Sequence, residues 1–182
     1  SMHMVPQTAW YAVSCLMRGM DARARRIVDE LVALQYDEPG TIWHGTFARF
    51  AEWPHPPENA VEWVDYDPNW REFVGTAFAV VLHRLADGLP DALVDRVRDS
   101  VDLAQRSEPD GRIGAHYANI ALMKAWLDAW AGRTEDAARL ATATFEHFTE
   151  HDAFLEYNSP TYYGIDLYAL ALWRSSDLLR DF

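Results

Sequence analysis

The stretch REFVGTAFAVVLHRLADGLPDALVDRVRDSVDLA, residues 71–104, contains the pattern that decides the fold. Its first part, REFVGTAFAVVL, is apolar on nearly every side of a helix, whereas its last part, ALVDRVRDSVDLA, has one charged face. A helix that is apolar all round is buried, and a one-sided helix covers it. Between them, Asp87, Gly88 and Pro90 are typical of a tight turn. The stretch therefore predicts a hairpin of one inner and one outer helix.

The same pair of helices recurs along the chain. Apolar residues at helical spacing predict seven helices and no alternating strand. Short turns with a glycine at 19, 88 or 132 follow the first, third and fifth helices, whereas longer loops lead into the third, fifth and seventh. The sequence therefore predicts an all-α fold of antiparallel helical hairpins in two layers. The predicted helices span residues 6–17, 22–34, 70–85, 92–104, 117–131, 135–148 and 160–173.

Composition limits the number of domains and the kinds of partner. A chain of 182 residues suits one domain, predicted for residues 5–182 because the start, SMHM, looks like a remnant of cloning. The net charge of -12 disfavours nucleic acid and anionic membrane surfaces, and no apolar run is long enough to span a bilayer. The single cysteine, Cys15, fits a reducing, cytoplasmic location and resembles a buried apolar residue more than a nucleophile.

If the short turns lie at one end of the hairpins, the long loops and the starts of the inner helices meet at the other end. This shared end is the predicted site, because loops and helix N-termini commonly bind ligands. In the first loop, Trp43 and Trp70 are candidate substrate-binding rings, or pack the loop onto the helices. His44 is a candidate general base or a structural histidine. Arg71 works against the dipole of its helix and is expected to pair with Asp65, Asp67, Glu156 or a substrate acid.

The second loop delivers His116, Tyr117 and Asn119 to the start of the fifth helix. His and Tyr can transfer protons, and an amide can hold a substrate oxygen. Lys124 and Asp128, four residues apart on that helix, are expected to form a structural ion pair.

The third loop carries FLEYNSPTYYGID, residues 154–166, an unusually polar and aromatic helix entrance. Ser159 and Pro160 are typical of a helix start. A carboxylate within a nearly apolar helix is either an acid or base tuned by burial, or a brace that orients the loop. The candidate residues are Glu156, Tyr162 and Asp166 for catalysis, and Asn158 and Tyr163 for substrate binding.

Metal binding is not predicted. His147 and His151 follow Glu146, but this order differs from the zinc-binding HExxH pattern and lies at the end of an outer helix. The sequence predicts no metal site and no cofactor.

The hairpin pattern, the aromatic loops and EYNSPTYYGIDLYALALW resemble the six-hairpin α/α-toroid enzymes, which include glycoside hydrolases and polysaccharide lyases. The resemblance implies a partial toroid, because the chain supplies three hairpins and one further inner helix. Either the chain is part of a larger toroid, or a second subunit completes the ring; the second option implies a homo-oligomer. In such lyases an Asn, a His and a Tyr act together beside a uronate carboxylate.

These observations together predict an enzyme, a hydrolase or lyase that acts on a carbohydrate or a related small molecule at the mouth of the toroid. One alternative is an isoprenoid isomerase or cyclase that stabilises a carbocation with aromatic faces. Another is a helical binding or scaffold module without catalysis. We expect Arg71, His116, Asn119, Glu156, Tyr162 and Asp166 to converge on one pocket.

Overall fold

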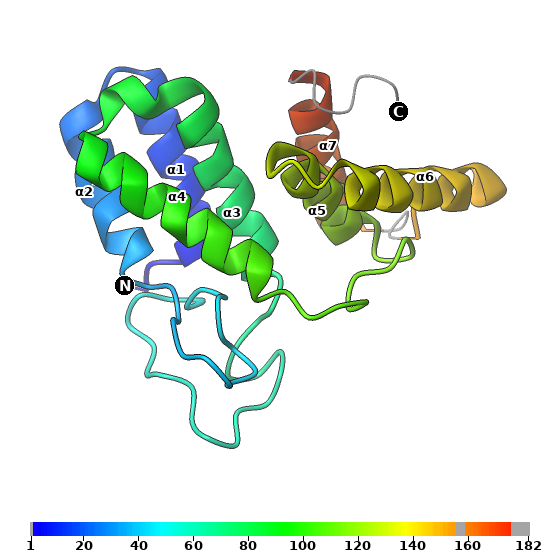
Figure 1. The fold of residues 1–182 in the computed structure, drawn as a ribbon, viewed down its shortest axis with the longest axis horizontal. Coiled ribbons are helices and arrows are strands. Elements are labelled where there is room, and N and C mark those ends of the chain that lie inside the picture. Colours follow the sequence, from blue (N-terminus) through cyan, green and yellow to red (C-terminus); the bar gives the residue numbers. More distant parts are fainter. Residues whose placement is uncertain (1, 156–158, 176–182) are drawn as a thin grey trace. The chain divides into compact units, whose positions relative to one another are not determined.

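The computed structural model describes residues 2–155 and 159–175, and it confirms the all-α fold. In this part of the chain, short β-bridges occur in loops, but no extended sheet forms. The helix after Trp70 changes to a π-helix, Val81–Leu85, and then to a 3-10 turn, Ala86–Gly88. The α-helices are α1 (Val5–Met17), α2 (Asp21–Val32), α3 (Trp70–Val80), α4 (Asp91–Arg106), α5 (Ala118–Trp130), α6 (Thr134–His151) and α7 (Pro160–Ser175) (Figure 1).

The chain divides into two compact units, one up to Glu108 and one from Pro109 onward. In the N-terminal unit, α1 packs against α2 and α3, while α4 packs against α3 and α2. Two hairpins, α1–α2 and α3–α4, therefore lie side by side, with α1 against α3 and α2 against α4. This is the predicted arrangement in two layers.

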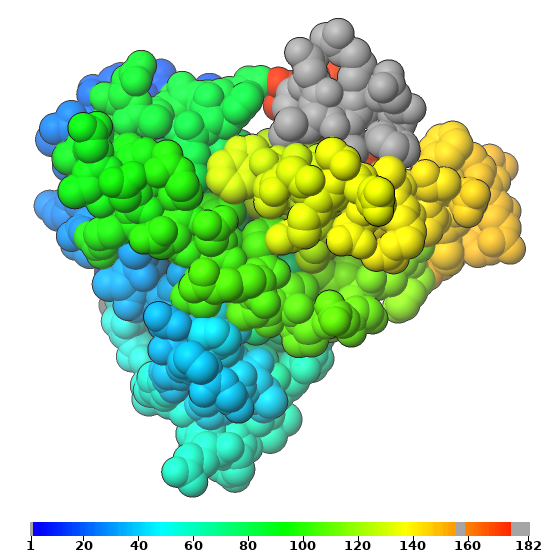
Figure 2. Space-filling view, viewed as in Figure 1, coloured from blue at the N-terminus to red at the C-terminus, as the bar shows by residue number. Residues whose placement is uncertain are grey.

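Burial follows the predicted difference between inner and outer helices. Nearly all of α3 is buried, including the polar residues Arg71, Glu72 and Thr76. By contrast, α2 buries one stripe, Ala24, Ile27, Val28 and Leu31, and α4 likewise buries one side. The spacing of that stripe is the 3.6-residue period of a one-sided helix. Figure 2 shows the outer helices α4 and α6, each at the surface of its own unit.

The two short turns of the N-terminal unit lie together at one end. Arg25 Nε, near the start of α2, donates a hydrogen bond to the Gly88 carbonyl at 2.8 Å. A Cβ atom on Gly88 would lie 2.6 Å from Leu16 Cδ2, so the turn fits against the end of α1 because residue 88 has no side chain. The long loop between α2 and α3 lies at the opposite end of these helices (Figure 1).

In the C-terminal unit, α5 is the central helix and packs against α6 and α7. Trp173 Nε1, in the last turn of α7, donates to the Leu122 carbonyl of α5 at 2.9 Å. The seventh helix was predicted to be buried on nearly every side, but in the structure Asp166, Ala169 and Leu172 are its buried residues. Leu167 is 65% exposed, because α7 has one main helix neighbour, α5, rather than several.

An ion-pair cluster closes the turn between α5 and α6. Lys124 Nζ donates to both carboxylate oxygens of Asp128 at 2.5 Å. Arg133, in the turn, donates to Asp128 Oδ1 through Nε at 2.9 Å, and Asp128 is buried. The predicted ion pair between Lys124 and Asp128 is confirmed.

Among the described residues, no helix has the length and apolar character needed to cross a membrane.

Candidate functional site

The predicted site residues belong to both units, and the contacts within each unit limit what each side chain can do. Glu156 and Asn158 lie outside the described residues. The N-terminal unit contains Trp43, His44, Trp70 and Arg71; the C-terminal unit contains His116, Tyr117, Asn119, Tyr162, Tyr163 and Asp166.

Arg71 is a buried brace that joins α3 to the long loop and to the end of α4. Its Nη2 donates to the His44 carbonyl at 2.5 Å, and its Nε donates to Ser107 Oγ at 3.4 Å. Its Nη1 lies 3.9 Å from Glu108 Oε2, and the side chains of this pair are 2% and 6% exposed. Glu108 was not among the expected partners, because nothing in the sequence brings the end of α4 next to the start of α3. The guanidinium is used by the protein itself, which argues against its predicted role in substrate binding.

Gly45 makes this close approach possible. Its φ is +78°, a left-handed conformation that residues with a Cβ atom rarely adopt. A Cβ atom there would lie 1.7 Å from Ser107 Oγ and 2.7 Å from Ser107 Cβ. The loop therefore contacts the end of α4 through backbone, directly beside the Arg71 hydrogen bonds.

His44 and Trp43 are held by Glu38 in the same loop. The Glu38 backbone N–H donates to His44 Nδ1 at 3.0 Å, which requires the lone pair of that nitrogen. The carboxylate of Asp37 is farther from Nδ1, at 3.7 Å, so the shorter amide bond decides the tautomer. The proton of the neutral ring then lies on Nε2, and this arrangement argues against His44 as a general base. Trp43 is buried and donates through Nε1 to Glu38 Oε2 at 3.1 Å, so it packs the loop.

A Glu38–His55 pair completes this cluster. His55 Nε2 bonds Glu38 Oε1, and His55 Nδ1 lies 2.9 Å from the Pro56 carbonyl. The hydrogen bond to Glu38, followed by that to Pro56, raises the pKa of His55. Desolvation, the largest single influence on Glu38, raises its pKa, but the hydrogen bonds from His55 and Trp43 together outweigh it and lower the pKa. Both ring nitrogens of His55 face acceptors, so the pair is a charged latch rather than a base with a free lone pair.

Two aromatic rings contact His55 of the latch. His55 lies edge-on to Tyr36, with centroids 5.3 Å apart, and edge-on to Trp43 at 6.0 Å. Trp43 packs in turn on Tyr66. Burial, and then the charge of Glu38, raises the pKa of Tyr36 to about 12. His55 is exposed, as the prolines on either side of it in the sequence indicate, and the usable signal for its pairing with Glu38 was a Glu, a His and several aromatic residues within one long loop.

Trp70, the first residue of α3, has a buried donor without an acceptor. Its residue exposure is 9%, and within the described chain Nε1 makes no hydrogen bond. Its ring lies edge-on to Phe73 with centroids 5.0 Å apart. A buried N–H group usually has a partner, so this atom is a candidate contact for a bound molecule or water.

The start of α5 is a buried helix N-terminus without a cap. The backbone N–H groups of Ala118, Asn119 and Ile120 donate no hydrogen bond within the described part of the chain. Like α2, α3, α4 and α6, the helix has no side-chain cap, but unlike them it also has no acidic residue in its first turn. The three residues are at most 2% exposed. Such an end favours an oxygen-bearing or anionic ligand, because its donors and the helix dipole are otherwise uncompensated.

Asn119 adds a buried acceptor at this helix start. The residue is 2% exposed, and Oδ1 accepts no hydrogen bond from the described residues. An unsatisfied buried amide oxygen costs about 1–3 kcal/mol. Donors and an acceptor of hydrogen bonds therefore lie on adjacent residues of one buried helix end.

The other predicted residues of this unit differ in exposure. His116 is exposed, its ring lies against Gly114, and Tyr117 is half-buried. On α7, Asp166 is 1% exposed, whereas Tyr162 is 49% exposed. Tyr162 and Asp166, which were predicted to share one face of the helix, thus lie at the surface and in the core, respectively. Tyr163 is half-buried in a row of rings with Phe154 and Phe148.

His147 and His151 pack ring against ring at the end of α6, with centroids 5.0 Å apart. No group of His, Cys, Asp or Glu suited to a metal ion occurs in residues 2–155 and 159–175.

Comparison with known proteins adds a family but no activity. No curated protein and no solved structure matches this chain. A family model described as Domain of unknown function (DUF8769) matches residues 1–176, and the chain therefore belongs to this family.

Proposed function

We propose that this chain is an enzyme of carbohydrates or related small molecules, a hydrolase or a lyase, that binds substrate at the N-terminal end of α5. The observation that carries the proposal is a set of buried polar groups at residues 118–120 that make no hydrogen bond within the described chain. They are three backbone N–H donors and one acceptor, the Asn119 side-chain oxygen. A ligand that both accepts and donates hydrogen bonds would satisfy them.

Sugars have this combination of groups. Each hydroxyl accepts and donates at once, and a uronic acid adds a carboxylate that suits an uncapped helix N-terminus. A hydrocarbon chain such as an isoprenoid has no group for the Asn119 oxygen, which favours the carbohydrate over the alternative.

In the lyase version, the α5 amides stabilise the negative charge that develops on the uronate when the neighbouring carbon loses its proton. His116, Tyr117 and Tyr162 are the candidate proton-transfer groups. In the hydrolase version, Asp166 supplies one of the two carboxyl groups, since a buried carboxyl group is the usual form of a general acid. Arg71 has no part in either version, because its donors already bind the protein.

The test uses Asn119→Leu, which keeps the side-chain size and removes the amide. Binding of a uronic-acid tetrasaccharide is measured by calorimetry beside its carboxyl-reduced counterpart, and turnover is followed as unsaturated product or new reducing ends. We expect the variant to lose about a hundredfold in turnover while its thermal midpoint stays level or rises, because an unsatisfied buried group is removed.

Thr144→Val is the matched control, since Thr144 is equally buried in the same unit and its Oγ1 is satisfied by the Leu140 carbonyl at 2.8 Å. This control should lose stability and keep turnover. The proposal would be refuted if neither sugar binds the unaltered chain. It would also be refuted if Asn119→Leu loses stability without losing turnover. Tight binding of a prenyl ligand instead would support the isoprenoid alternative.

The proposal also includes a homo-oligomer, in which a second copy of the chain completes the toroid. Leu167 and Leu170 of α7 are 65% and 37% exposed, which an additional helix would cover. The mass in solution tests this point, because a stable monomer would remove it.

A further inference from the structure

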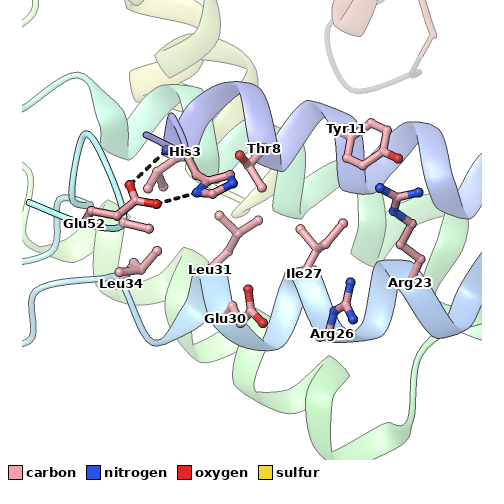
Figure 3. A pocket seen from close by; sticks show the side chains of 12 residues that line it. His3, Thr8, Tyr11, Arg23, Arg26, Ile27, Glu30, Leu31, Leu34 and Glu52 are labelled. Carbon is pink, nitrogen blue, oxygen red and sulfur yellow. Dashed lines mark hydrogen bonds and ion pairs between the residues drawn. The ribbon is translucent and has the colours of Figure 1, made fainter. Parts of the chain in front are cut away.

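A cavity of about 540 Å³ lies between α1 and α2 in the N-terminal unit, closed on one side by Ala51 and Glu52 (Figure 3). Its size falls within the range of about 300–1,000 Å³ that is typical of small-molecule sites. Its lining residues all belong to the N-terminal unit, whereas the site proposed on α5 belongs to the C-terminal unit.

The floor of the cavity is apolar. Val5 of α1 and Ile27 and Leu31 of α2 contribute to it, and each is at most 8% exposed. Figure 3 shows Ile27 and Leu31 side by side between the two helices, with Leu34 beyond them. These side chains belong to the hydrophobic core, so a ligand that reached them would bury apolar surface against a rigid wall.

Two arginines lie at the rim. The Arg23 guanidinium lies over the Tyr11 ring, 5.1 Å from its centroid, and Arg26 is one turn farther along α2. Neither has a carboxylate within 4.0 Å among the described residues. In a chain with a net charge of -12, two such guanidinium groups at one cavity are unusual and create a local site for an anion.

The acids at the rim leave this charge largely available. Glu52 accepts a hydrogen bond from the His3 backbone N–H at 2.9 Å and also bonds the His3 ring. Glu30 is the other carboxylate, and it lies one turn beyond Arg26, toward the Leu31 end. The rim is thus positive at the Arg23 end and negative at the Glu30 end, so the anionic group of a ligand is favoured near Arg23.

We propose that this cavity binds a carboxylate with an apolar tail, such as a medium-chain fatty acid. The carboxylate contacts Arg23 and Arg26, and the tail lies on Ile27 and Leu31 toward Leu34. Arg23 and Leu31 are eight residues apart, about 12 Å along the helix axis, so head and tail fit along one side of α2. The residues proposed to bind the ligand do not include any of residues 1–4.

The probes are decanoate and decanol, which share a tail and differ in the charged head. Calorimetry with the full chain at low salt should show decanoate binding about tenfold more tightly than decanol, because hydrogen bonds to charged groups are the stronger ones. Arg23→Gln combined with Arg26→Gln should weaken decanoate about tenfold and leave decanol unchanged. NMR signals of the Ile27 and Leu31 methyl groups should move with both probes, which places the tail.

Arg98→Gln is the matched control, since Arg98 is an exposed arginine on α4 whose charge is already paired with Asp95 at 2.8 Å. It should bind decanoate as the unaltered chain does. Equal affinity for decanoate and decanol, an equal loss in Arg98→Gln, or methyl signals that do not move would each overturn the proposal.

Discussion

Gly45→Ala tests whether the loop and α4 are held as closely as the structure shows. An alanine at φ +78° costs about 1–2 kcal/mol through backbone strain. The new Cβ would also lie 1.7 Å from Ser107 Oγ, and such overpacking typically costs about 1–3 kcal/mol more. We therefore expect the free energy of unfolding of the N-terminal unit to fall by about 2–5 kcal/mol.

Gly40→Ala separates the two costs. Gly40 belongs to the same loop and has φ +93°, but nothing lies within 4 Å of its Cβ position. This variant should therefore lose only the backbone term, about 1–2 kcal/mol. Ser107→Gly removes the clashing atoms, so Gly45→Ala with Ser107→Gly should cost about 1–3 kcal/mol less than the sum of the two single changes.

The assay is urea unfolding combined with hydrogen exchange, because two units need a local probe. The amides of Tyr36 and Ala48 suit this purpose, since they bond the Thr46 and Leu34 carbonyls at 2.9 and 3.0 Å within the loop. Equal losses for Gly45→Ala and Gly40→Ala, or additive losses in the double variant, would refute the close contact between Gly45 and Ser107.

Two further predictions concern the same unit. Arg71→Met should lower its free energy of unfolding by about 3–5 kcal/mol, because the buried ion pair with Glu108 is broken; adding Glu108→Gln should restore part of this loss in urea unfolding, and strict additivity would show that the two do not interact. The Glu38–His55 latch should stabilise the loop between about pH 4.5 and 6.5. Its contribution is lost as pH rises through the raised pKa of His55 and as pH falls through the lowered pKa of Glu38. Urea midpoints should therefore stay level across this range and decline above it in the unaltered chain, and His55→Asn should flatten that decline; an unchanged profile would contradict the latch.

The positions of the helices were predictable because hydrophobic periodicity is a local property. The inner and outer character of α3 and α4 is already present in residues 71–104, and the glycines at 19 and 132 end helices in the left-handed conformation that favours glycine. α7 differed in character, since its apolar residues do not specify how many neighbours cover them, and α1 likewise buries one side while Tyr11 and Met17 are exposed.

The candidate site was less predictable, because its chemistry depends on contacts between distant residues. Arg71 was expected to need a carboxylate, but its partner Glu108 comes from the end of α4. His44 was predicted as a general base or a structural histidine, and the choice depends on its Nδ1, which accepts a hydrogen bond from the Glu38 amide. Asn119 was named for its residue type, whereas its unsatisfied oxygen follows from burial, which the sequence does not show.

Local patterns in the sequence are enough to predict an acidic, all-α chain of inner and outer helices joined by alternating short and long connections. Periodicity, turn residues and charge are properties of neighbouring residues, so they can be recognised without a structure. Tertiary structure alone decided that the long loop closes on itself through Glu38 and His55, that Gly45 meets Ser107, and that α5 begins buried and uncapped. These features arise where residues that are distant along the chain come into contact, and no local pattern encodes that contact.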